Sequence, residues 1–383
     1  IYAELGFSSL LKELDNGIEI PSDGFVLIDQ DEQLHDLADK LSKASILAID
    51  TETTSLNVRS AELVGVSISV NRQHSYYIPV GHRGEDGALI SPQLSLDSVK
   101  TVLAPYLLSD TILKIGHNVK YDYAVLEKNM GISLRPPIAV TMMVAHLAEP
   151  LRRSFKLDDL CLDQGLKLTS YGEVVEGDKR EDAFAYVAVD RACSYSCEDV
   201  YGTFVLWDYY QELLETNGQM SLFADVEMAL VPILARMERS GIMVDEACLD
   251  DLAKEFEEKL QVLEKEIFSL AGHEFNINSP QQLGTVLFDE LELPHGRKTK
   301  TGYSTDMKVL EKLAAKHDLP AHIIKYRNLA KLLTTYVEKL KLLIDPDTRR
   351  IHTSYNQAVT ATGRLSSSNP NLQNIPIRAE EGN

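Results

Sequence analysis

At 383 residues the chain is too long for one ordinary hydrophobic core, and 44% hydrophobic with 25% charged residues is typical of folded globular proteins, so we expect two domains. No run approaches the ~18 apolar residues that span a bilayer, and no basic segment precedes an apolar run at the start, which argues against a membrane span and a secretion signal; because residue 1 is Ile1, we expect the sequence to begin inside a longer protein. The net charge of −20 argues against a protein whose whole surface binds nucleic acid.

The first half of the sequence predicts an α/β arrangement. An amphipathic helix is expected over residues 1–20, followed by a break, and short apolar runs then alternate with helical patterns. The predicted strands cover residues 44–49, 63–70, 74–80 and 111–115, and the predicted helices cover residues 97–108 and 119–215. Neighbouring antiparallel strands, then a helix, another strand and further helices are typical of a domain with a mixed sheet.

The second half predicts mainly helices. Residues 222–239 and 246–271 carry apolar residues at the 3.6-residue period, and a further long helix covers residues 320–344. Ser279 followed by Pro280 predicts a helix start, with the serine as N-cap and the proline as first helical residue.

Positive charge is concentrated near the carboxy-terminal end. From residue 321 onward nine Lys and Arg residues stand against five Asp and Glu residues, a net charge of +4, which leaves −24 for residues 1–320. A basic end on an acidic body is compatible with DNA bound at one place. The acidic body suits carboxylates that gather around divalent metal ions.

The cysteines indicate a reducing compartment. They are Cys161, Cys193, Cys197 and Cys248, and only Cys193 and Cys197 are close in sequence. Their spacing is compatible with half of a zinc site, but no second Cys or His pair follows. Two small apolar residues on one helix are therefore the preferred interpretation.

Three separated acidic motifs share one possible chemistry. The first is Asp50-Thr51-Glu52, directly after an apolar strand. On a strand, residues two apart point to the same face, so both carboxylates can bind one metal ion while Thr51 turns away. In a chain with 58 acidic residues, such a triplet is weak evidence by itself.

The second motif, GHNVKYD, lies where a predicted strand passes into a helix. Asn118 and Asp122 are four residues apart and fall on one helical face. A simple helix start would give the same pattern, with Asn118 as N-cap and Asp122 as a first-turn acid favoured by the helix dipole.

The third motif, YSCED, lies within a predicted helix. Tyr195 and Asp199 share one face, whereas Glu198 is rotated roughly a quarter-turn away and is expected to take no part. A helix with a core tyrosine and a solvated acid would read the same. The three motifs together, in this order and on these elements, favour the functional interpretation.

These motifs resemble those of the DEDD exonuclease superfamily, in its tyrosine subclass. The phrases IDTETTSL, GHNVKYD and YSCED closely match those of proofreading DNA polymerases of family A. The resemblance implies an α/β fold, a ribonuclease H-like mixed-sheet domain with 3′→5′ exonuclease activity. We assign this domain to residues 25–217, after a linker and helix over residues 1–24.

The resemblance also implies a two-metal site. Asp50, Glu52 and Asp199 would hold one Mg²⁺ or Mn²⁺, and Asp50 with Asp122 the other. Ions about 4 Å apart can lower the pKa of an attacking water and stabilise the attacking and leaving oxygens of a phosphodiester. Two divalent ions would also relieve the mutual repulsion of four carboxylates.

The same resemblance assigns further residues around the metals. Tyr195 would orient the attacking water, Leu56 would pack against the terminal base, and Asn118 would support the site from behind the metal ligands.

A second resemblance covers residues 352–376. The phrase HTSYNQAVTATGRLSSSNPNLQNIP closely resembles the primer-template segment of family A polymerases, as does YRNLAK over residues 326–331. Short polar side chains suit sugar and phosphate, and one Arg can probe minor-groove acceptors common to every base pair. The resemblance assigns Arg364 to the primer's minor groove. It assigns to the duplex the residues Arg327, Lys331, Thr360, Asn371, Gln373 and Asn374.

The resemblance implies that residues 218–383 form a mainly α-helical polymerase thumb and the start of the palm. The basic loop 295–303, with Arg297, Lys298 and Lys300, looks like the tip of the thumb. In the family the polymerase catalytic motifs would follow Asn383. We therefore expect the sequence as given not to extend a primer, and the remainder of the polymerase domain and a 5′ nuclease domain to lie in the parent protein.

The expected partners are primer-template DNA and single-stranded 3′ ends, bound by a monomer in the cytoplasm, at the bacterial nucleoid. A ribonuclease D-like exoribonuclease would share the carboxylates and the tyrosine, but it does not account for TGRLSSSNPNLQNIP. A non-catalytic DNA-clamping fragment is the third hypothesis, and the retention of four carboxylates and a tyrosine argues against it.

Overall fold

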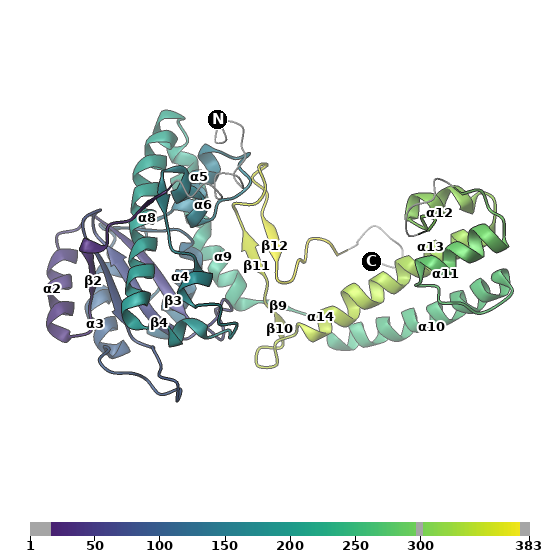
Figure 1. Ribbon diagram of the computed structural model, residues 1–383, viewed down its shortest axis with the longest axis horizontal. Helices are drawn as coiled ribbons and strands as arrows, with labels where there is room; N and C mark the ends of the chain where they lie inside the picture. The colour runs from purple at the N-terminus through teal and green to yellow at the C-terminus, as the bar shows by residue number, and fades with distance from the viewer. Residues whose placement is uncertain (1–16, 296–301, 376–383) are drawn as a thin grey trace. The chain divides into compact units, whose positions relative to one another are not determined.

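The computed structural model describes residues 17–295 and 302–375 (Figure 1). Its contacts divide the chain into two units, Ile1–Arg239 with Tyr355–Ser366, and Ser240–Ser354 with Ser367–Asn383. The helix predicted over residues 1–20 falls mostly outside the described residues, as do Arg297, Lys298 and Lys300. Among the described helices, none is long and apolar enough to cross a membrane.

A six-stranded mixed sheet forms the centre of the first unit and confirms the predicted fold class. In spatial order its strands are β2 (Phe25–Leu27), β5 (Ser75–Pro79), β4 (Leu63–Ser69), β3 (Ile46–Thr53), β6 (Leu113–Gly116) and β7 (Ile138–Val140). Strands β3, β4 and β5 are antiparallel neighbours, whereas β2 joins β5, β6 joins β3 and β7 joins β6 in parallel. The four predicted strands are present, and β2 and β7 are additional.

Helices cover the sheet and bury its apolar residues. They are α2 (Asp31–Leu41), α3 (Leu96–Leu107), α4 (Val119–Met130), α5 (Thr141–Ala148), α6 (Leu157–Asp163), α7 (Tyr171–Val174), α8 (Val189–Thr216), η3 (Leu222–Glu227) and α9 (Met228–Ser240). The long helix α8 packs across β3, β4 and β5 (Figure 1). Tyr76 and Ile78 enter the main core, while the intervening Tyr77 packs with Cys193 and Cys197 of α8. This alternation follows from the two-residue period of a strand.

The first unit extends beyond the predicted boundary between residues 217 and 218. Phe223, Met228, Val231 and Ala235 of η3 and α9 belong to the main core of this unit. Apolar contact therefore keeps α9 with the sheet, and the contacts divide the chain after Arg239. Sequence periodicity locates such a helix but does not reveal the core in which it is buried.

The second unit is mainly helical. Its helices are α10 (Glu246–Ala271), α11 (Pro280–Gly284), η4 (Thr285–Glu290), α12 (Met307–Ala314), α13 (Asp318–Lys331), η5 (Leu332–Glu338) and α14 (Lys339–Leu342). The last three follow one another without a break, as the predicted helix over 320–344 requires, and they pack against α10 around Phe256, Leu329 and Leu333. Ser279 accepts a hydrogen bond from the backbone N–H of Gln282, 3.4 Å away, and thus caps α11.

The remaining strands of the described residues are short. They are β1 (Ile18–Glu19), β8 (Leu166–Lys167), β9 (Ile242–Met243), β10 (Arg350–Ile351), β11 (Ser354–Asn356) and β12 (Ser366–Ser368). The chain passes from the second unit to the first within β11 and returns within β12. Residues 355–366 are consequently part of the first unit, although the boundary predicted from sequence assigns them to the second domain.

Candidate metal centre

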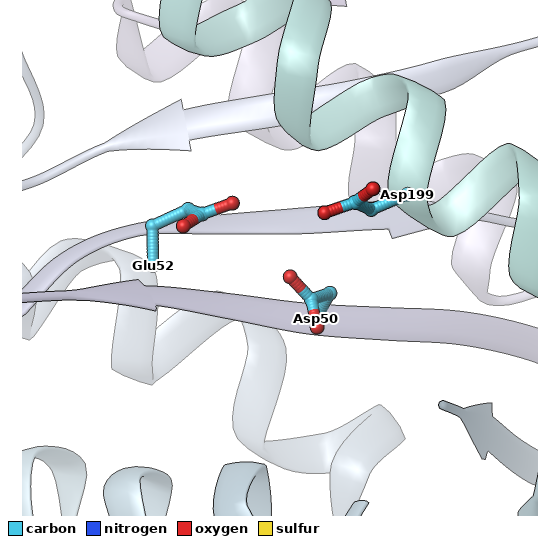
Figure 2. A group of neighbouring side chains, drawn as sticks. All are labelled: Asp50, Glu52 and Asp199. Atoms are coloured by element: carbon cyan, nitrogen blue, oxygen red, sulfur yellow. The ribbon is translucent and has the colours of Figure 1, made fainter. Parts of the chain in front are cut away.

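Three carboxylates converge at the end of strand β3. Asp50 and Glu52 project from β3 towards helix α8, and Asp199 projects from α8 to meet them (Figure 2). One ligand oxygen from each lies within 4.8 Å of the other two. The two-residue spacing on a strand accounts for the first pair, and the packing of α8 against β3 brings in the third. This is a set of hard oxygen ligands of the kind that divalent cations bind.

Asp122 stands beside this group and is held by the strand itself. The Thr51 hydroxyl donates a hydrogen bond of 2.6 Å to Asp122 Oδ1. Strand β3 pairs with β6 only over Ile46–Ala48, so Thr51 lies past the end of β6, where α4 begins. The expectation that Thr51 turns away from the site is therefore wrong, because its side chain fixes the fourth carboxylate.

The electrostatics of the four carboxylates are those of a site that lacks a compensating cation. Burial, followed by the charges of the other carboxylates, raises the pKa of Asp50 well above its usual range, and burial and the Glu52 charge do the same for Asp199. Burial raises the pKa of Glu52 to about 7 and that of Asp122 to about 7. Every charge that shifts Asp50 is another carboxylate. A divalent cation would remove this repulsion, so the residues fit the predicted metal.

A serine that sequence reasoning did not single out positions Glu52. Ser196 is fully buried on α8, and its hydroxyl donates a hydrogen bond of 2.8 Å to Glu52 Oε1. It precedes Asp199 by three residues and so shares its helical face. That spacing within YSCED is the signal that would have identified it.

Tyr195 reaches the same group from the preceding turn of α8. Its phenol lies close enough to the Asp199 carboxylate to be affected by its charge, and its ring lies 5.8 Å from the Phe184 ring, tilted by 55°. Burial, followed by the charge of Asp199, raises the pKa of Tyr195 well above its usual value. The phenol therefore keeps its proton and is suited to hydrogen bonding rather than to accepting a proton as a base.

Glu198 points elsewhere. Its carboxylate accepts hydrogen bonds from the Thr169 backbone N–H at 2.6 Å and the Thr169 hydroxyl at 3.2 Å. It is absent from the group formed by Asp50, Glu52 and Asp199, but it holds the segment that leads into α7. Glu198 thus stabilises the position of Thr169 through hydrogen bonds.

Leu56 projects from a loop that follows β3. Its side chain is 92% exposed, the largest fraction among the exposed large apolar residues that the structure describes. The loop is held near its tip, where the Tyr121 hydroxyl donates to the Ser55 carbonyl at 2.6 Å and the Ser55 hydroxyl donates to Glu181. An apolar side chain fully exposed on a loop held in this way is a candidate contact for a ligand.

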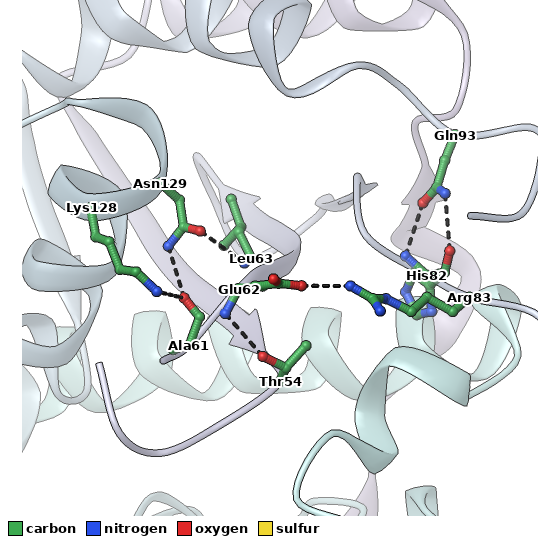
Figure 3. Close-up of polar contacts among 9 residues, drawn as sticks. All are labelled: Thr54, Ala61, Glu62, Leu63, His82, Arg83, Gln93, Lys128 and Asn129. Carbon is green, nitrogen blue, oxygen red and sulfur yellow. Dashed lines mark hydrogen bonds and ion pairs between the residues drawn. The ribbon is translucent and has the colours of Figure 1, made fainter. Parts of the chain in front are cut away.

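The base of the same loop is closed by a network of polar contacts (Figure 3). The Glu62 backbone N–H donates to the Thr54 hydroxyl at 2.9 Å, and Lys128 of α4 donates to the Ala61 carbonyl at 2.7 Å. Arg83 forms an ion pair with Glu62 at 2.5 Å. Helix α4, which supplies Asp122, therefore also fixes the base of the loop that presents Leu56.

Tyr171 is a second residue that sequence reasoning missed. Its ring is 46% exposed and stacks on Phe184, with centroids 6.3 Å apart and planes inclined by 17°. Burial, followed by the charge of Glu52, raises the pKa of Tyr171. The Tyr171 phenol is therefore close enough to Glu52 to be affected by its charge, while nearly half of the residue remains exposed.

Asn118 occupies the N-cap position of α4, but its side chain forms no capping hydrogen bond. The Asn118 side chain is exposed. The residue directly precedes α4, the helix that carries the candidate ligand Asp122. The adjacent His117 is instead buried, with ring contacts of 2.9 Å to the Thr141 hydroxyl and to the Phe155 carbonyl. These contacts fix the junction of β6 with α4.

The predicted duplex-binding residues divide between the two units. Thr360 and Arg364 belong to the first, where the Thr360 hydroxyl donates to the Arg364 carbonyl at 2.6 Å and leaves the Arg364 side chain exposed. In the second unit, Arg327 is half-buried and donates to the Thr305 carbonyl at 2.5 Å. Its guanidinium is thus engaged within the unit, and sequence could not reveal this partner.

Exposed members of the predicted set also lie in the second unit. They are Lys331, Asn371, Gln373 and Asn374. The Asn371 side chain accepts a hydrogen bond of 3.0 Å from the Gln373 backbone, and the Asn374 carbonyl accepts one of 2.7 Å from the Tyr336 hydroxyl.

Comparison with known proteins identifies the first unit. A family model described as 3′-5′ exonuclease matches residues 25–215, which span the mixed sheet, Asp50, Glu52, Asp122 and Asp199. The fold and the carboxylates therefore define a protein with a 3′-5′ exonuclease domain.

The remaining matches cover the rest of the chain. The family model for DNA polymerase family A matches residues 246–383. DNA polymerase I of Pseudomonas aeruginosa is 38% identical over 403 residues, with 100% of this chain and 43% of that protein covered, and DNA polymerase I of Bacillus subtilis is 34% identical over 383 residues, with 100% and 41% covered. The chain belongs to DNA polymerase family A.

A solved structure is similar as well. It is the POL domain of Pol1 from M. smegmatis in complex with DNA primer-template and dNTP, with a TM-score of 0.72 and 30% identity over 93% of this chain and 57% of that chain. The chain spans about two fifths of the length of the curated relatives named above.

Proposed function

We propose that this chain removes nucleotides from the 3′ ends of DNA by metal-dependent hydrolysis, as the proofreading part of a DNA-directed DNA polymerase. The observation that carries the proposal is the convergence of Asp50, Glu52 and Asp199 within 4.8 Å, without a cation among the charges that shift their pKa values. Carboxylates brought together at this cost are typical of sites that bind divalent ions.

The proposed ligand set assigns one Mg²⁺ or Mn²⁺ to Asp50, Glu52 and Asp199, and a second to Asp50 and Asp122. When bound, such ions activate water and stabilise the charge that develops on the phosphate. Ser196 holds Glu52 and Thr51 holds Asp122, so two neutral hydroxyl donors orient the ligands without competing for the ions.

The surrounding side chains suit a terminal nucleotide. Tyr195, which keeps its proton, would orient a water beside Asp199 by hydrogen bonding. The exposed Leu56 side chain and the partly exposed Tyr171 ring would supply apolar surfaces against which a base can pack irrespective of its identity. Asn118 lies exposed at the start of α4, where it can contact the strand.

The duplex-binding part of the proposal rests on polar residues that are exposed or, for Thr360, half-buried. Arg364 and Thr360 in the first unit, and Lys331, Asn371, Gln373 and Asn374 in the second, would contact primer and template. Arg327 would act through the internal bond to Thr305, by holding the helix that carries Lys331. We further propose that the chain acts as a monomer in the bacterial cytoplasm, within a longer polymerase that supplies nucleotide addition.

Cleavage of labelled DNA tests the proposal. The chain is incubated with a 5′-labelled single-stranded oligonucleotide of DNA or RNA, with EDTA or with Mg²⁺ or Mn²⁺, and the product ladder is resolved. Stepwise metal-dependent shortening of DNA is expected. Preference for RNA would support a ribonuclease D-like enzyme, and intact DNA under every metal would refute the nuclease assignment and leave a DNA-clamping function.

A further inference from the structure

Residues 355–366 are fastened to the nuclease body at three places. Gln357 donates to the Glu227 carboxylate at 2.6 Å and to the Glu227 carbonyl at 3.1 Å. Ala358 packs against the main core of the unit. Together with the third contact, described next, these interactions explain why the segment belongs to the first unit.

The third contact is a closed polar triangle centred on Glu238 of α9. One oxygen, Glu238 Oε1, accepts a hydrogen bond of 2.6 Å from the Tyr355 backbone N–H and forms an ion pair with Lys120. Lys120 also donates to the Tyr355 carbonyl at 2.5 Å. The Lys120 and Glu238 side chains are only 15% and 20% exposed, so the pair is largely shielded from water.

The triangle joins two functional parts of the unit. Lys120 lies two residues before Asp122 on α4, the helix that supplies a proposed metal ligand, and Tyr355 begins the segment that carries Thr360 and Arg364. A charge-assisted network of this kind favours one geometry, since the three groups contact one another pairwise. It therefore fixes the segment relative to the carboxylates.

We propose that Glu238 is a positioning residue that couples duplex contact to 3′-end excision. By tying residues 355–366 to α4, it sets the distance at which a duplex bound by Arg364 can deliver its 3′ end to the carboxylates. A single strand does not need this spacing. The proposal rests on the proposed function, in particular on duplex contact by Thr360 and Arg364.

The chain offers a matched control one residue away. Arg239 forms an ion pair of 2.5 Å with Glu127, which also joins α9 to α4, but this pair contacts no residue of 355–366 in the described interactions. Arg239→Ala therefore weakens the same helix pair without releasing the segment. Glu238→Gln retains an oxygen for the Tyr355 N–H and loses the ion pair with Lys120, which makes it the conservative variant.

The test compares excision of a mismatched 3′ nucleotide from a primer-template duplex with excision from the primer alone, in Mg²⁺. For Glu238→Ala we expect kcat/KM on the duplex to fall about tenfold, mainly through KM, with little change on the single strand. Glu238→Gln should fall between, and Arg239→Ala should match the wild type. An unchanged ratio of duplex to single-strand kcat/KM in Glu238→Ala, or an equal loss on both substrates, would overturn the coupling.

Amide hydrogen exchange provides a second measurement that needs no DNA. In Glu238→Ala the amides of 355–366 should exchange faster than in Arg239→Ala, while those of β3 stay protected. Unchanged exchange in the segment would contradict the positioning role. Failure of the wild type to cleave either substrate would instead refute the proposed nuclease function, so the two failures are distinguishable.

Discussion

Removing one carboxylate from the candidate metal centre should stabilise the metal-free protein. Asp122 is the informative position, because Asn keeps an oxygen that can accept the 2.6 Å hydrogen bond from the Thr51 hydroxyl. In the metal-free fold, burial raises the pKa of Asp122 from 3.8 to about 7. At about 1.4 kcal/mol per pH unit, this gap corresponds to a penalty of about 4 kcal/mol when Asp122 is ionised in the folded state.

The sign follows from proton binding. Between pH 3.8 and about 7 the unfolded chain has released this proton while the folded chain retains it, so the free energy of unfolding falls as pH rises and the penalty is complete above pH 7. Because the neighbouring carboxylates can take up protons in compensation, we expect Asp122→Asn to gain about 1–3 kcal/mol at pH 8 and almost nothing at pH 4.

The assay is thermal unfolding of the wild type and Asp122→Asn in EDTA at pH 4, 6 and 8, followed by repetition with Mn²⁺. A gain of 1–3 kcal/mol corresponds to a rise in Tm of roughly 3–10 °C for a unit of this size. Mn²⁺ should stabilise the wild type more than the variant, and the variant should lose cleavage. Asp208→Asn is the control, since Asp208 lies on α8 rather than α4 and is a half-exposed ion-pair partner of Arg72, and the effect of its replacement should be small and independent of pH. Destabilisation of Asp122→Asn at pH 8 in EDTA, or an equal gain at every pH, would refute the mutual repulsion that we infer.

Five further substitutions, in four experiments, test individual roles. Ser196→Ala removes the donor to Glu52 and should raise the metal concentration for half-maximal cleavage by about tenfold or more, measured by Mn²⁺ titration. Asp199→Ala should abolish cleavage. Glu198→Ala should lower Tm, because its hydrogen bonds to Thr169 are lost, but should leave kcat near that of the wild type. An equal loss of kcat in both variants would show that the assignment within YSCED is wrong. Leu56→Ala should raise KM several-fold with little effect on Tm, because the side chain is 92% exposed, and an unchanged KM would exclude base contact. Arg364→Ala should weaken binding to duplex more than to single-stranded DNA in a salt titration, and equal weakening would remove its minor-groove role.

The acidic motifs show which features of the site can be predicted from local sequence. The alternation of a strand places Asp50 and Glu52 on one face, and the helical period places Tyr195 and Asp199 on another, so neighbouring residues alone predict which side chains can act together. The cap formed by Ser279 before Pro280 was predictable for the same reason, because a helix start depends on a few adjacent residues. The fold class likewise follows from the order of these periodic segments.

Contacts between distant segments decided the rest. Thr51 meets Asp122 because β3 runs past the end of β6, and Ser196 meets Glu52 because α8 packs against β3. The spacing within YSCED places Ser196 on the face of Asp199, but it does not reveal that Glu52 is its partner. Residues 355–366 join the first unit through partners that lie more than a hundred residues away in the sequence. Arg327 donates a hydrogen bond to the carbonyl of Thr305, a contact that periodicity does not identify. Local backbone preferences act over a few residues, so sequence determined which elements form and which acids they carry. Burial and hydrogen bonding between those elements depend on how the whole chain packs, and only the tertiary structure decided them.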